Sequence, residues 1–126
     1  MRDQMDATKG PEFEEVSEAF NLSSFHAGFL KLAILKLVSQ RPFHGYALMK
    51  EIERMSEGTW RPSPGSVYPA LQDLLRSGYI VQEAEGRRRI YRITPQGDII
   101  LRFALDHMRT SIMNLENLLA YQPQDD

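Results

Sequence analysis

Three consecutive arginines, Arg87, Arg88 and Arg89, form the longest run of basic residues in the 126-residue sequence. They follow Gly86 and lie between two stretches rich in Tyr, Ile and Val, which is the pattern of a β-hairpin with a basic tip. Guanidinium groups at such a tip can bind the phosphates of nucleic acid. A charged turn is more often only solvated, so the arginines predict phosphate contacts only if a DNA-binding element lies beside them.

A helix predicted just before the hairpin, over residues 64–77, is a candidate for that element. Ser63 can cap this helix, and Pro64 suits its first position. Its N-terminal end is small and polar, so free backbone amides there can approach phosphate. Apolar residues recur at helical spacing and define an inward face: Val67, Leu71, Leu74 and Leu75. The residues left outside are Gly65, Ser66, Pro69, Gln72, Asp73 and Arg76, with Tyr68 at the border. Of these, the candidate DNA contacts are Gly65, Ser66, Tyr68, Pro69 and Gln72.

Pro69 is unusual at its place in this helix. It lacks the amide that would donate to the carbonyl of Gly65, so we expect the first turn to be distorted or displaced. A purely structural alternative stays open for the segment, in which the serines only cap a helix and Tyr68 packs against the core.

No residue pattern predicts catalysis, a metal site or a bound cofactor. The sequence has no cysteine, and His26, His44 and His107 are not spaced as a ligand set. No nucleophile with a base and no glycine-rich phosphate loop is visible. Trp60 could stack on a ligand, but a hydrophobic anchor for the loop before residues 64–77 is the better interpretation. We therefore expect a protein that is not an enzyme.

The net charge of -2 argues weakly against a nucleic-acid partner, but its distribution matters more. Residues 1–20 carry two basic and six acidic side chains, a balance of -4, whereas residues 60–96 carry six arginines and three acidic side chains, a balance of +3. A small basic patch is therefore predicted. No membrane span or signal peptide is visible, so we expect a cytoplasmic protein.

Hydrophobic periodicity and capping residues predict a mainly α-helical fold with one small β-hairpin. Ser23 or Ser24 can cap the first core helix, and the turn at residues 41–45 separates it from a second one. Two short helices followed by a hairpin indicate a winged helix-turn-helix. The expected parts are a mobile acidic tail (1–12), an accessory helix (13–22), a winged helix-turn-helix (23–95) with strands at 79–84 and 89–94, and a long C-terminal dimerisation helix (96–122).

The long C-terminal helix carries an apolar seam with successive spacings of 4, 3, 4, 3 and 4 residues. A seam of this kind is typical of a helix that packs against a partner helix, so it predicts a homodimer. In the alternative, the stripe packs against the accessory helix and first core helix of its own chain. The seam consists of Leu101, Leu105, Met108, Ile112, Leu115 and Leu119.

Three motifs together, in this order, resemble the PadR family of transcriptional regulators: His44-Gly45-Tyr46, the run from Pro64 to Leu71, and the run from Tyr91 to Gly97. The resemblance covers residues 28 to about 121. Because the C-terminal part has room for only one long helix, the sequence is most similar to the small subfamily, whose members dimerise through that helix. It implies a repressor that binds an inverted repeat in double-stranded DNA and releases it on meeting a small aromatic effector.

The resemblance also implies roles for single residues. Ser63, Gly65, Ser66, Tyr68 and Pro69 match the DNA-facing helix, Arg87 to Arg89 match the wing, and His44 and Tyr46 match contacts to the DNA backbone. The effector is expected near the dimer axis beside Phe103, His107 and Met108, although the tryptophan common in this helix of small members is absent here. The competing hypothesis is a winged-helix module that binds protein and not DNA.

Overall fold

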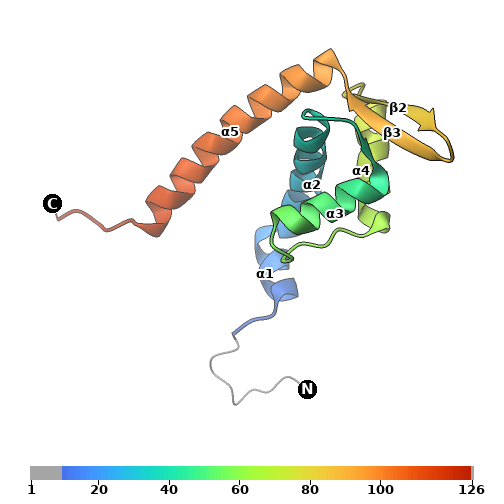
Figure 1. Cartoon of the computed structure of the whole chain (residues 1–126). Coiled ribbons are helices and arrows are strands. Elements are labelled where there is room, and N and C mark those ends of the chain that lie inside the picture. The colour runs from blue at the N-terminus through green and yellow to red at the C-terminus, as the bar shows by residue number, and fades with distance from the viewer. Residues whose placement is uncertain (1–9, 126) are drawn as a thin grey trace, which may run out of the picture.

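The computed structural model describes residues 10–125, and the chain forms helices and a small sheet in the predicted order (Figure 1). Residues 1–9 of the expected tail lie outside the described residues. The fold is mainly α-helical, with one three-stranded antiparallel sheet. No helix within residues 10–125 is long and apolar enough to span a membrane. The elements are α1 (Phe13–Phe20), α2 (Leu22–Val38), β1 (Phe43–His44), α3 (Gly45–Met55), α4 (Pro64–Arg76), β2 (Ile80–Glu85), β3 (Arg88–Ile93) and α5 (Pro95–Leu119).

The core lies where α2, α3 and α4 meet, and the sheet closes one side of it. Ile34 of α2, Ile52 of α3 and Leu71 of α4 are fully buried there. Removing such a side chain from water stabilises the fold by about 1.5–3 kcal/mol. The apolar stripe of α4 is therefore held inward, and its other face is left exposed.

One expectation about a helix start needs correction. Helix α2 begins at Leu22, so Ser23 and Ser24 lie inside it and neither is its N-cap. Asn21, with a left-handed φ of 56°, ends α1 and begins α2, since asparagine tolerates this conformation better than most residues. In α4, the helix runs from Pro64 to Arg76 without interruption across Pro69.

The sheet has the order β1-β3-β2, and β1 is a strand that sequence reasoning missed. It pairs Phe43 with Tyr91, across the segment interpreted above only as a turn. In the hairpin, Glu85 pairs with Arg88, so only Gly86 and one arginine form the turn. Gly86 has a φ of 62°, which suits the first central position of a two-residue hairpin turn.

Helix α5 is anchored at its first turn. The Thr94 side chain accepts a hydrogen bond from the Gly97 amide at 3.0 Å and donates one to the Gly78 carbonyl at 2.6 Å. A Cβ at Gly97 would lie 2.1 Å from the Tyr79 carbonyl oxygen, so only glycine permits this close crossing. From there α5 extends away from the other helices (Figure 1). At 1.5 Å per residue its length is about 38 Å.

Candidate nucleic-acid interface

A groove of about 350 Å³ lies between the hairpin, the start of α3 and the exposed face of α4. It is lined by residues that the sequence pointed to from three separate segments: His44 and Tyr46, Tyr68, and Arg87 to Arg89. The fold therefore brings the basic hairpin tip beside the predicted DNA-facing helix. The remaining α4 candidates are exposed on that helix: Gly65, Ser66, Pro69 and Gln72, with Ser63 at its N-cap.

Tyr68 owes its position to Gly45, the first residue of α3. A Cβ at Gly45 would lie 2.8 Å from the Tyr68 hydroxyl oxygen and 3.0 Å from two ring carbons. The ring of Tyr68 therefore lies against the bare backbone of Gly45 and remains 42% exposed. Sequence reasoning missed this role of Gly45. The available signal was a glycine at the start of a helix, where other residues are better helix formers.

The hairpin arginines differ from most other arginines of the described chain in having no acidic partner. Arg87, Arg88 and Arg89 form no ion pair with any residue in the range 10–125, and all three are exposed. Their charges are thus available to an outside anion. The arginines with a carboxylate partner are Arg54, Arg61, Arg76, Arg92, Arg102 and Arg109.

Two more groups shape the floor of the groove. The His44 imidazole Nε2 lies 3.2 Å from Glu85 Oε1, although it is not aligned for a hydrogen bond. Backbone pairing of β1 with β3 brings His44 to this position near the end of β2. Burial raises the pKa of the Tyr91 phenol above its ordinary value.

The N-terminal end of α4 carries two exposed hydroxyls. Ser63 occupies the N-cap position with an extended backbone, as expected, but its side chain accepts no backbone hydrogen bond. Its hydroxyl donates instead to the Ser66 hydroxyl at 3.4 Å, and its carbonyl accepts from the amides of Ser66 and Val67. Both side chains are therefore presented at the surface without being tied to the helix backbone.

The predicted seam of α5 divides into two parts. Leu101 is only 3% exposed and Leu105 is partly buried, because both pack against the core of their own chain. The seam that is free for a partner therefore begins farther along the helix than the spacing suggested. Met108 is half-buried, whereas Ile112, Leu115 and Leu119 are exposed by 53%, 55% and 79%. Phe103 and His107, expected beside an effector, are also exposed.

Comparison with known proteins gives a family match and similar structures. Residues 34–102 match the transcriptional regulator PadR-like family. Transcriptional regulator YqjI of Escherichia coli (strain K12) is 40% identical over 74 residues, or 58% of this chain and 36% of that protein. Transcriptional regulator Rv3488 of Mycobacterium tuberculosis (strain ATCC 25618 / H37Rv) is 33% identical over 99 residues, or 73% of this chain and 90% of that protein.

A solved transcriptional regulator from Clostridium thermocellum has the same fold, with a TM-score of 0.69 and 25% identity over 75% of this chain and 94% of that one. The chain spans only about a third of YqjI, but it covers nearly all of Rv3488. The family match includes α3, α4 and the hairpin, which build the groove, and also the start of α5. This protein belongs to the PadR-like family of transcriptional regulators.

Proposed function

We propose that the protein binds double-stranded DNA sequence-specifically, with α4 in the major groove and the hairpin on the adjacent phosphates. The observation that carries the proposal is the exposed face of α4 next to three arginines without acidic partners. Arginine on phosphate supplies affinity, and side chains at base edges supply sequence preference. The candidates for base contacts on α4 are Ser66, Tyr68 and Gln72.

We also propose that the active form is a homodimer joined through α5, with residues 23–95 as the DNA-binding part of each chain. The exposed stripe of Ile112, Leu115 and Leu119 supports this, because apolar side chains in a regular seam are stabilised by burial against a second helix. Two-fold symmetry would present two copies of α4. The matching DNA is an inverted repeat with half-sites about one helical turn apart, roughly 34–36 Å.

The regulator would act in the cytoplasm as a repressor that an effector releases from DNA. The predicted effector site near Phe103, His107 and Met108 depends on the dimer, since Phe103 is 70% exposed in the single chain. This site stays a prediction, as does the role of repressor.

The test is fluorescence anisotropy with DNA from upstream of the protein's own gene, and with a shuffled duplex of the same composition. We expect tighter binding to the upstream DNA by at least tenfold. Gln72→Ala should narrow this preference, because each lost base contact is worth about 1–3 kcal/mol. Gln40→Ala, exposed beyond the end of α2, is the matched control and should leave it unchanged.

Equal affinity for both duplexes would contradict sequence-specific binding to that DNA. Absence of binding to either duplex at low salt would favour the protein-binding alternative for this fold.

A further inference from the structure

The imidazole of His44 carries an unusual buried atom. Among residues 10–125, its Nε2 is the one buried side-chain nitrogen or oxygen without a hydrogen-bond partner. Buried polar atoms nearly always have such a partner, because leaving one without it costs free energy. Glu85 Oε1 lies 3.2 Å from this nitrogen, and the His44 side chain is only 21% exposed. A proton on the imidazole would turn this contact into an ion pair.

The contact lies in the groove that the hairpin arginines line. His44 of β1 pairs with Ile90 of β3, and Glu85 ends β2 on the far side of β3, so the two side chains meet across that strand. Within the described chain, His44 is the only ion-pair partner of Glu85. The other charged or titratable groups of the groove come from the hairpin, α3 and α4: Arg87, Arg88, Arg89, Tyr91, Tyr46 and Tyr68.

The charge of this groove can change near neutral pH through His44. Histidine is the only side chain whose ordinary charge change falls between pH 5 and 8. While His44 is neutral, the carboxylate of Glu85 is a negative charge close to the three arginines. A proton on His44 adds one positive charge and neutralises that carboxylate. The groove is therefore more positive at the lower pH, and a polyanion should bind it more tightly there.

We propose that His44 and Glu85 make the affinity of this groove for a polyanionic backbone depend on pH, with binding strengthened when His44 gains a proton. Coupling between two ligands is reciprocal, so a bound backbone that favours the protonated imidazole is itself bound more tightly as the pH falls. Phosphate contacts carry no base information, so affinity should change and sequence preference should not. The effect on DNA rests on the proposed function, whereas the effect on another polyanion does not.

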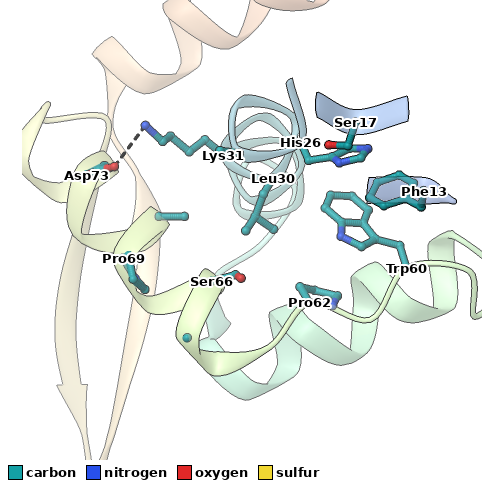
Figure 2. Close-up of a pocket in the computed structure, with 13 residues that line it drawn as sticks. Phe13, Ser17, His26, Leu30, Lys31, Trp60, Pro62, Ser66, Pro69 and Asp73 are labelled. Carbon is teal, nitrogen blue, oxygen red and sulfur yellow. Dashed lines mark ion pairs between the residues drawn. The ribbon is translucent and has the colours of Figure 1, made fainter. Parts of the chain in front are cut away.

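The test measures binding of the full chain to the shuffled duplex by anisotropy, at about pH 6 and about pH 8. We expect the wild type to bind about fivefold more tightly at the lower pH for each chain in contact, the factor for one partly exposed ion pair. His44→Gln cannot take up the proton, so its ratio should be about one. His26→Gln is the matched control and should keep the ratio, because His26 stacks on Phe13 of α1, outside the groove (Figure 2).

Glu85→Gln tests the carboxylate separately. It removes the negative charge at every pH, so it should strengthen binding at about pH 8 by about fivefold per chain. If the contact only supported the hairpin structure, the same change would weaken binding.

Retention on heparin, a sulfated polymer without bases, is the second measurement. The wild type should need more salt for elution at about pH 6 than at about pH 8, and His44→Gln should elute at the same salt concentration at both. The proposal is overturned if the wild type shows no pH ratio on heparin, if His44→Gln keeps the ratio, or if Glu85→Gln weakens retention. Heparin retention without duplex binding would contradict only the proposed function.

Because each result is a ratio within one variant, partial misfolding would weaken binding at both pH values and leave the ratio readable.

Discussion

Neutralising the hairpin tip separates affinity from sequence preference. We expect the double change Arg87→Gln and Arg88→Gln to weaken binding to every duplex by a similar factor. Both side chains are exposed and have no ion-pair partner among residues 10–125, so the change removes two available charges and breaks no ion pair. Phosphate contacts of this kind carry no base information.

The size of the effect follows from the number of contacts. A dimer would lose up to four phosphate contacts, and each releases roughly 0.9 counterion from B-DNA. The slope of log affinity against log salt concentration should therefore fall by up to about 3.6. Doubling the salt would then weaken the wild-type complex up to about twelvefold more than the variant complex.

Anisotropy titrations at five salt concentrations measure this slope. The matched control is Arg92→Gln, because Arg92 is on the same strand but is already neutralised by Glu83, with Nε 2.5 Å from Oε1. Its slope should stay close to that of the wild type. An unchanged slope in the double variant, or an equal loss in Arg92→Gln, would refute the assignment of the hairpin to phosphate.

Three further outcomes are expected. Ile112→Glu with Leu115→Glu should give a monomer in analytical ultracentrifugation, because two carboxylates per chain would enter the apolar seam. Gly97→Ala should destabilise the fold by about 2–3 kcal/mol in urea unfolding, since its Cβ would overlap a backbone carbonyl that cannot easily move. Gly45→Ala should displace the Tyr68 ring and cost about tenfold in DNA affinity, as for one lost base contact. Since the ring is partly exposed, the free energy of unfolding should change by less than about 1 kcal/mol.

Each of these three predictions has a control variant. Thr110→Glu with Asn117→Glu adds the same charge to α5 away from the seam, and the dimer should survive. Gly28→Ala in α2 meets nothing within 4 Å, so it should stabilise the protein by about 0.5–1 kcal/mol. For Gly45→Ala, the comparison variant is Tyr68→Ala, which should lose a similar amount of affinity for DNA. The seam assignment would be contradicted if Ile112→Glu with Leu115→Glu remained a dimer. The packing argument at Gly97 would be contradicted if Gly97→Ala left the free energy of unfolding unchanged, and the argument at Gly45 if Gly45→Ala kept full affinity for DNA.

The sequence alone determined most of the secondary structure. A serine before the helix and proline at its first position predicted the start of α4 at Pro64, and glycine predicted the hairpin turn. These signals are local, because capping, proline geometry and apolar spacing act within one or two turns of a helix or strand. The candidate α4 and hairpin residues were identified from the same local patterns and from the family resemblance.

The tertiary structure decided which of these residues meet. Strand β1 exists because Phe43 finds a partner in Tyr91, 48 residues away in the chain, and two residues have no strand signal of their own. An apolar seam predicts burial but cannot say against what, so only packing showed that Leu101 enters its own core. The fit of Tyr68 on Gly45 and the approach of His44 to Glu85 likewise depend on contacts between distant segments, which no local pattern specifies.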